Sequence, residues 1–253
     1  MSHTTDPQSP PTALSLRILD RLVAETDVTE IATPWSELTS NAFPGPAGSV
    51  RCFTGEGQVA AVVHISLVVA PIGLDSHMVF AFGADDGPLP HFTLDAVRTG
   101  DIHAFHLDLV QRADLAPNRA YTEQVYVPLT AAFEKAGEVT GFTAAHITPR
   151  QRALMSPWML AHRADAAAFA EVGPLADTYL DHWLALAENF PAEAADEVKD
   201  SGLADRDHRM RSLLFSREVD PVWAQVDRLV GTDVADGLRS LLITGRPAVE
   251  ETP

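Results

Sequence analysis

Five stretches rich in β-branched and aromatic residues follow one another in the first half of the chain, with only short, turn-forming links between them. We predict a strand for each of them: residues 49–54, 58–70, 77–83, 91–98 and 102–110. Parallel neighbours would need long crossover connections, usually helices, and none fits into these links. The five strands are therefore expected to form an antiparallel meander. No glycine-rich phosphate loop lies between a strand and a helix here, which argues against a nucleotide-binding α/β domain.

Segments with a helical spacing of apolar residues flank this meander on both sides. We predict helices at residues 12–25, 34–39, 120–135, 150–158, 165–189, 203–215, 221–230 and 233–242. This order predicts an α+β fold, an α/β/α three-layer sandwich in which helices flank a central antiparallel sheet. We expect one domain over residues 12–246. Disordered tails are expected at residues 1–11, which are rich in Ser, Thr and Pro, and at 247–253.

The composition narrows the classes of partner. A formal net charge of -17 repels phosphate groups, so we expect neither nucleic acid nor an anionic membrane as a partner. The most apolar stretch, residues 59–71, is about half as long as a membrane-spanning helix. The first residues lack the features of a secretion or transit signal, so we expect a cytoplasmic protein. The single cysteine, Cys52, leaves no internal disulfide and no multi-cysteine metal site.

The histidines of the predicted sheet do not form a metal site. Side chains alternate between the two faces of a strand, so His103 and His106 point to opposite sides and cannot bind one ion. We therefore predict no metal ligands. His64 and His77 also fall inside predicted strands, so the sheet carries an unusual number of histidines. Each is expected to be hydrogen-bonded within the sheet, or together they line a polar, partly aqueous cavity.

Asp95 is a carboxylate in the middle of a predicted strand. His91 and Thr93 share its face, because they lie four and two residues away, respectively. Two interpretations are open. Asp95 points to solvent, or it is an acid in a pocket, where apolar neighbours would raise its pKa toward neutrality. In the second case it is a candidate proton donor.

A basic cluster, Arg206-Asp207-His208-Arg209-Met210-Arg211, interrupts an otherwise acidic chain. Asp207 and Arg211 are i, i+4 neighbours on a predicted helix, so an intrahelical ion pair explains them. Alternatively, Arg206 or Arg211 binds the carboxylates of an anionic ligand while Asp207 transfers protons. The spacing leaves both interpretations open.

Several short motifs resemble, in order and spacing, the red chlorophyll catabolite reductase family, which is related to the ferredoxin-dependent bilin reductases. They are Phe92-Thr-Leu-Asp95, Leu107 to Leu115 with Tyr121, Met155-Ser-Pro157, Arg206-Asp207 with Arg211, and Val230 to Leu242. The resemblance covers residues 49–243. Asp95 stands where the family has a pocket glutamate, and Asp207 where it has a pocket aspartate. The shorter acid at position 95 is a departure that bears on the substrate.

The resemblance implies a pocket for an open-chain tetrapyrrole between the sheet and the C-terminal helices, and reduction of one of its double bonds. It also implies that no cofactor is bound, that external ferredoxin supplies electrons, that Asp95 and Asp207 supply protons, and that the protein is a homodimer. The residues expected to contact the substrate are His91, Thr93, His106, Ser156, Arg206 and Arg211. Because ferredoxins are acidic, docking would need a local basic surface such as residues 206–211.

Two other functions fit the same fold and pocket. The first is a cofactor-free acid/base enzyme, an isomerase or cyclase, that acts on a bulky conjugated molecule through Asp95 and Asp207. The second is a pigment-binding protein without turnover. Nucleophilic catalysis has little support, because the chain has no G-x-S-x-G motif and Cys52 has no base implied beside it.

Overall fold

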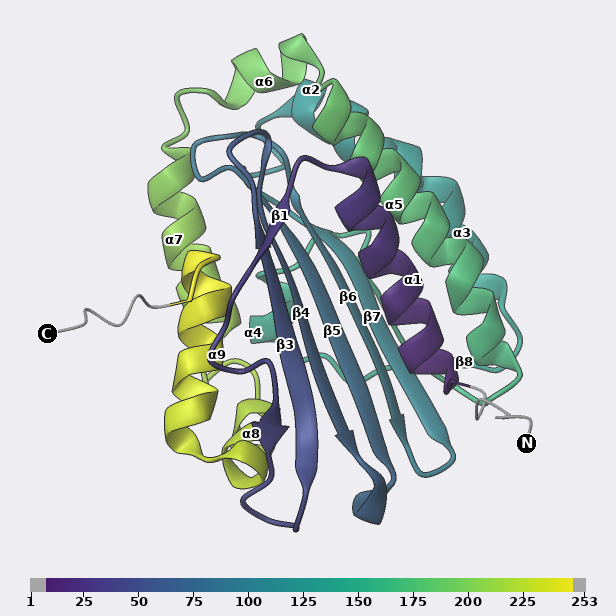
Figure 1. Ribbon diagram of the computed structural model, residues 1–253. Helices are drawn as coiled ribbons and strands as arrows, with labels where there is room; N and C mark the ends of the chain where they lie inside the picture. Colours follow the sequence, from purple (N-terminus) through teal and green to yellow (C-terminus); the bar gives the residue numbers. More distant parts are fainter. Residues whose placement is uncertain (1–7, 248–253) are drawn as a thin grey trace, which may run out of the picture.

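The computed structural model describes residues 8–247, and in this part of the chain nine strands form one sheet with helices on both faces (Figure 1). Every pair of neighbouring strands is antiparallel. The α+β three-layer sandwich predicted from the sequence is confirmed. In their order across the sheet, the strands are β1 (Thr29–Ile31), β3 (Pro46–Thr54), β4 (Val59–Val69), β5 (Leu74–Gly83), β6 (His91–Thr99), β7 (Ile102–Val110), β9 (Leu160–Ala164) and β8 (Phe142–Ala144), and β2 (Leu38–Thr39) pairs with β3.

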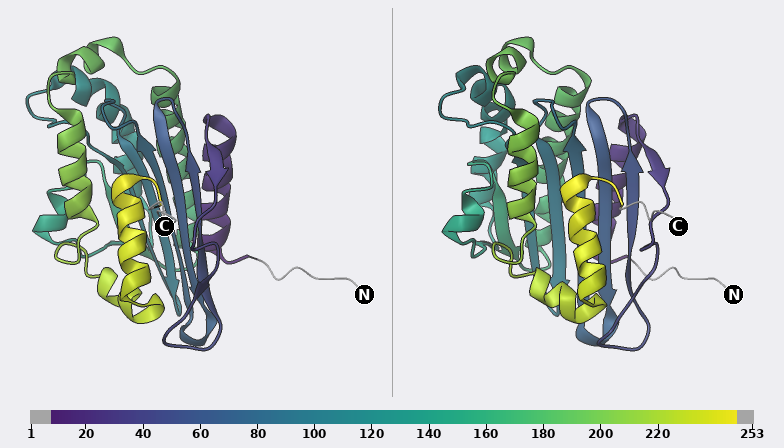
Figure 2. Two further views of the ribbon diagram at one scale, coloured as in Figure 1. Left: turned by 60° about the vertical axis from the view of Figure 1, so that its left-hand side comes forward. Right: turned by 90° about the vertical axis from the view of Figure 1, so that its left-hand side faces the viewer.

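The helices divide between the two faces of the sheet (Figures 1 and 2). One face is covered by α1 (Pro10–Glu25) and α5 (Val172–Glu188), and α3 (Thr130–Glu138) packs against α5. The other face is covered by α7 (Leu203–Leu214), α8 (Trp223–Val230) and α9 (Thr232–Thr244). The shorter helices are α2 (Arg119–Tyr121), α4 (Pro149–Arg152) and α6 (Ala192–Val198). None of the helices in residues 8–247 is both long and apolar enough to cross a bilayer.

Each face of the sheet packs against its helices to form a separate apolar core. Leu19 of α1, Phe92 of β6 and Trp183 of α5 belong to the first core. Val63 of β4 and Leu238 of α9 belong to the second. Because side chains of the central strands are buried on both sides, β4 reads as a continuous apolar run rather than as an alternation. Polar side chains on such strands therefore need a specific polar partner, either within the protein or in a ligand or water.

The predicted central strands agree with the structure, whereas several flanking elements differ. The predicted helix at 34–39 is wrong: Leu38 and Thr39 form β2 against β3, since so short a segment gains more from pairing than from one helical turn. The predicted helix at 120–135 is interrupted at Pro128, which lacks an N–H, and residues 122–129 form π and 3₁₀ turns. Four short elements, β1, β8, β9 and α6, were not predicted at all.

The predicted helices at 150–158 and 165–189 are shorter in the structure. The first is reduced to α4, and the second begins only at Val172, after a 3₁₀ turn over Ala168–Glu171. In contrast, α1 begins two residues earlier than expected, at Pro10, because the hydroxyl of Ser9 caps it. The tails expected at the two ends fall largely on residues 1–7 and 248–253, which lie outside the described residues.

Candidate active site

The β6–β7 hairpin presents four polar side chains to the face of the sheet that α7 and α8 cover. In its register Asp95 lies opposite His106, and Thr93 lies opposite Asp108. Directly paired residues project to the same side of a sheet, so these four side chains form one patch. The alternation expected from the sequence is therefore correct for this hairpin, and Asp95 faces the C-terminal helices.

Asp95 and His106 form a half-buried pair with free polar atoms. Nδ1 of His106 lies 3.5 Å from Oδ2 of Asp95, and the two side chains are 16% and 32% exposed, respectively. The buried atoms Oδ1 of Asp95, Nε2 of His106 and Oγ1 of Thr93 have no hydrogen-bond partner among the described residues. Buried polar groups are normally satisfied, so an open set of this kind in one patch indicates a place for ligand or water.

Acidic neighbours favour the protonated form of His106. Burial by itself lowers the pKa of an imidazole, but the contact with Asp95 and the charges of Asp95, Asp108 and Asp220 outweigh it and raise the pKa of His106 above its ordinary value. An imidazolium whose Nε2 proton is unused is a general acid near neutral pH. The patch can therefore deliver a proton to a group beside it.

Ser156, expected to contact a substrate, instead connects the loop before β9 to the sheet. Its backbone N–H and its hydroxyl both donate to the carboxylate of Asp108, at 2.9 and 2.5 Å. The same hydroxyl accepts from the N–H of Trp158. Burial raises the pKa of Asp108, while His106 and the bonds from Ser156 oppose that rise. Ser156 has no hydrogen bond left to offer, so we assign it to the support of Asp108.

The connection between α7 and α8, residues 215–222, adds groups that the sequence did not single out. Burial raises the pKa of Asp220, and the charge of Asp95 raises it further, which brings a third carboxylate to the patch. The buried Oγ of Ser216 and Nε1 of Trp223 also lack partners within the described residues. No local motif marks these residues, because they reach the sheet only through the way α7 and α8 pack on it.

Arg217 fixes this connection to the helices around it. Its Nε and Nη2 donate to the two carboxylate oxygens of Asp227 at 2.8 and 2.6 Å, and its Nη1 lies 2.5 Å from Oδ1 of Asp236. Arg239 donates to the carbonyl of Phe215 at 2.7 Å. These bonds to α8 and α9 hold the segment that carries Asp220.

An apolar cavity of about 400 Å³ lies on the same face of the sheet, further along β6 from Asp95. Val97 lines it and lies two residues from Asp95 on the same face of β6; Val222 lines it from the other side, two residues after Asp220. Leu74, Val226 and Leu229 also line it. The site thus joins a polar group of acids to a mostly apolar pocket, which is the usual composition of a small-molecule site.

His91 and Asp207 form a second histidine–carboxylate pair, and both ring nitrogens of His91 have hydrogen-bond partners. Nε2 of His91 lies 2.6 Å from Oδ1 of Asp207, while Nδ1 accepts from the N–H of Gly83. An accepting Nδ1 requires the neutral imidazole with its proton on Nε2. Burial accordingly lowers the pKa of His91 to about 4, an effect that the Asp207 charge only partly opposes. Both ring nitrogens are used, so the expected contact of His91 with substrate is not offered by this arrangement.

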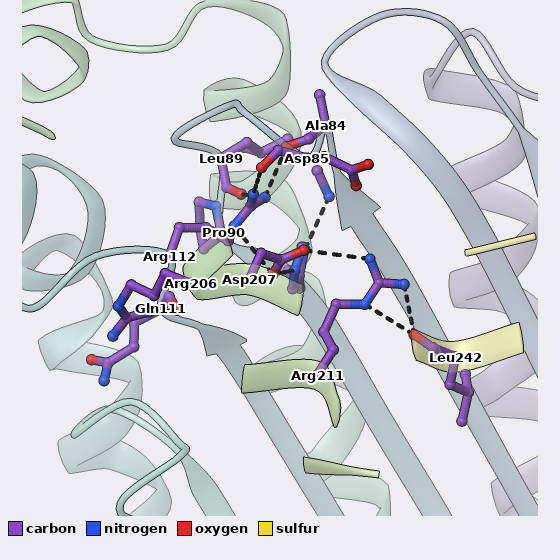
Figure 3. A network of polar contacts seen from close by, with 12 residues as sticks. Ala84, Asp85, Leu89, Pro90, Gln111, Arg112, Arg206, Asp207, Arg211 and Leu242 are labelled. Carbon is purple, nitrogen blue, oxygen red and sulfur yellow. Dashed lines mark hydrogen bonds and ion pairs between the residues drawn. The ribbon is translucent and has the colours of Figure 1, made fainter. Parts of the chain in front are cut away.

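Two buried arginines approach Asp207 from opposite sides (Figure 3). Burial alone would raise the pKa of Asp207, but the bond from His91 and the charges of Arg112 and Arg211 lower it to about 2. Arg211 also donates to the carbonyl of Leu242 at 2.6 and 3.0 Å. The intrahelical pairing of Asp207 and Arg211 is the interpretation that this geometry favours, and the network joins α7 to the sheet and to α9.

The resemblance implied that Asp95 and Asp207 share one pocket, and the structure places Asp207 away from Asp95. It bonds to His91, which lies four residues from Asp95 on β6, or about 13 Å along the strand. Arg206 does not reach the patch either, because it donates to the carbonyl of Gln111 and to Asp114. The carboxylate that accompanies Asp95 is Asp220.

The remaining sheet histidines lie on the opposite face of the sheet. Nε2 of His64 lies 3.1 Å from Nδ1 of His77, and Nε2 of His77 lies 2.8 Å from Oδ1 of Asp75. His103 packs against Phe169. A single cavity lined by all the histidines is therefore ruled out. In residues 8–247 no group of three His, Cys, Asp or Glu side chains is placed to hold a metal ion.

Comparison with known proteins identifies a structural relative. No model of a protein family matches the sequence, and no curated protein matches it. Among solved structures, that of phytochromobilin synthase from tomato, in complex with biliverdin, has the same fold, with a TM-score of 0.73 and 18% sequence identity. The match covers 92% of this chain and 83% of the tomato chain.

Proposed function

We propose that this protein reduces a double bond of an open-chain tetrapyrrole or a similar conjugated molecule, with electrons from an external donor such as ferredoxin. The observation that carries the proposal is the half-buried Asp95–His106 pair, with its free polar atoms beside an apolar cavity. A flat conjugated ring suits such a cavity, and pyrrole nitrogens and ring carbonyls suit the polar atoms next to it. The fold shared with phytochromobilin synthase, solved in complex with biliverdin, supports the same conclusion.

Protons are the contribution of the protein to this reaction. Reducing one double bond takes two electrons and two protons, and each added electron places negative charge on the conjugated system. His106 donates the proton on Nε2 to that charge while its Nδ1–H stays beside Asp95, and solvent returns a proton to Nε2 before the second transfer. Asp108 and Asp220 stabilise the imidazolium between transfers. We assign proton delivery to Asp95 and His106 rather than to Asp207, whose carboxylate is ionised and enclosed.

Two tetrapyrroles are candidate substrates within this class. Red chlorophyll catabolite is the substrate that the sequence motifs favour, and biliverdin is the molecule in the structural relative. The test is to mix the purified protein with both, with and without a ferredoxin-reducing system, and to follow the visible spectrum. We expect a spectral shift on binding and loss of conjugation only when the donor is present.

Each other outcome of that experiment assigns a different function. Turnover without any electron donor would identify an acid/base isomerase or cyclase that uses the same Asp95–His106 pair. A spectral shift without turnover under either condition would identify a pigment-binding protein. No spectral shift with either tetrapyrrole would contradict the proposal.

A further inference from the structure

A basic segment stands out in this acidic chain. The protein has 35 Asp and Glu residues in 253, about one in every seven positions, yet none lies between residues 139 and 164. The same 26 positions carry three arginines and two histidines, and we call them the basic strip: they contain β8, α4 and β9, with His146, Arg150, Arg152, His162 and Arg163.

The fold brings the basic strip to the edge of the candidate site. On β9, Arg163 lies opposite Ala104, which shares its face of β7 with His106 two residues further on. The spacings of an antiparallel sheet put the Cα atoms of Arg163 and His106 about 8 Å apart. The loop after α4 is bonded to Asp108 through Ser156. Both views of Figure 2 show α4 next to α7, on the side of the sheet that carries the site.

The strip presents free cations to solvent. Arg152 and Arg163 are exposed, and neither has an ion-pair partner within residues 8–247. Arg150 pairs with Glu218 at 3.1 Å, and their side chains are 56% and 77% exposed. An exposed pair of this kind contributes little and exchanges partners readily. Cations spread over a helix and a strand suit an extended acidic surface better than one small anion.

In residues 206–211, the basic surface expected from the sequence, two of the three arginines are bonded within the protein and the third, Arg209, is exposed on α7. Arg211 is buried and bonded to Leu242, and Arg206 is bonded to Gln111 and Asp114. Their charges are used inside the protein. On the face that carries the site, Arg152 and Arg163 are exposed beside the strand and loop that hold His106 and Asp108, whereas the exposed Arg209 and Arg228 lie on α7 and α8.

We propose that the basic strip is the docking surface for an acidic electron-carrier protein, which delivers electrons to the substrate beside His106. This inference rests on the proposed reductase function. Each docking oxidises the carrier by one electron, so two dockings and two protons from the site complete the reduction of one double bond. Opposite charges on the two surfaces raise the rate of encounter and make it sensitive to salt.

The test compares a charge-reversed strip with a matched control. In the double variant Arg152→Glu/Arg163→Glu, both substitutions are at exposed positions; the control Arg119→Glu reverses an exposed arginine on α2, away from the strip. We expect the double variant to lose about tenfold or more in kcat/KM for a reduced [2Fe–2S] ferredoxin, with a weaker dependence on salt. Turnover with photoreduced deazariboflavin, a small donor without net charge, should stay at the wild-type rate. The control should match the wild type with both donors.

Binding of oxidised ferredoxin, measured by calorimetry at low salt, tests docking without turnover. Wild-type protein should bind, the double variant should bind at least about tenfold more weakly, and Arg152→Gln/Arg163→Gln should fall between them. Equal binding by wild type and double variant, or no binding by wild type, would overturn the docking surface. Failure of turnover with both donors would refute the reductase function instead, so the two failures are distinguishable.

Discussion

At the scale of single residues, the two histidine–carboxylate pairs of β6 and β7 differ in what they leave free. His91 and Asp207 bond to each other, Arg112 and Arg211 lie beside Asp207, and every polar side-chain atom of His91 and Asp207 has a partner. Asp95 and His106 keep one buried atom each without a partner. Strand periodicity alone predicted that Asp95 and His91 share a face. It could not predict their different partners, because Asp207 is 116 positions away from His91 in the sequence.

This difference predicts opposite results for two conservative substitutions. Asp207→Asn removes the charge that compensates Arg112 and Arg211 in a buried site, and we expect a loss of about 3–5 kcal/mol in the free energy of unfolding. Asp95→Asn changes a half-exposed pair and should cost about 1 kcal/mol or less. Urea unfolding measures both. Equal losses would contradict the separation into a structural and a catalytic pair.

The buried histidines predict an acid-sensitive fold. Burial, with the charges of His77 and Arg51, lowers the pKa of His64 to about 3. The unfolded chain takes up this proton as pH falls below about 6.5, whereas the folded protein does not, so stability decreases from pH 6.5 downward. His64→Gln removes this contribution, and its stability should fall less steeply, by up to about 1.4 kcal/mol per pH unit. Denaturant unfolding between pH 7 and 4.5 tests it; parallel curves would show the assignment to be wrong.

At the scale of elements, sequence reasoning succeeded where a period repeats over many residues and failed where an element is defined by its neighbours. The five meander strands, α7 and α9 have such periods and were predicted within a few residues. Strands β8 and β9 are three and five residues long and exist because they pair with each other and with β7. The α7–α8 connection has no period, yet it carries Asp220 to the site.

The bridge from Arg217 to Asp227 and Asp236 should therefore matter more for turnover than for stability. Its members are partly exposed, so Arg217→Met should cost about 1 kcal/mol or less on unfolding. The same change frees the connection that holds Asp220 near His106, and we expect turnover to fall with every electron donor. Hydrogen exchange at residues 215–222 should rise in parallel. A variant with loosened exchange and unchanged turnover would remove Asp220 from the mechanism.

At the scale of the whole molecule, the two faces of the sheet differ in their apolar cores and in their polar groups. The face under α1 and α5 packs a large apolar core and encloses His64, His77 and His103 in structural contacts. The face under α7, α8 and α9 holds a smaller core, the apolar cavity and the Asp95–His106 patch. The sequence predicted the layers because hydrophobic patterns are local. It did not predict which helix covers which polar group, because that depends on the packing of elements distant in the chain.

The measurement that tests the central claim most directly is single-turnover reduction by Asp95→Asn. The protein is loaded with the tetrapyrrole that it binds, reduced anaerobically, and followed by its visible spectrum, with the wild type and Arg119→Glu alongside. We predict the wild-type spectral shift on binding, because the cavity is unchanged, and a rate of product formation lowered by about 100-fold or more, because the pair that delivers protons is broken. Product formation at the wild-type rate would contradict the account.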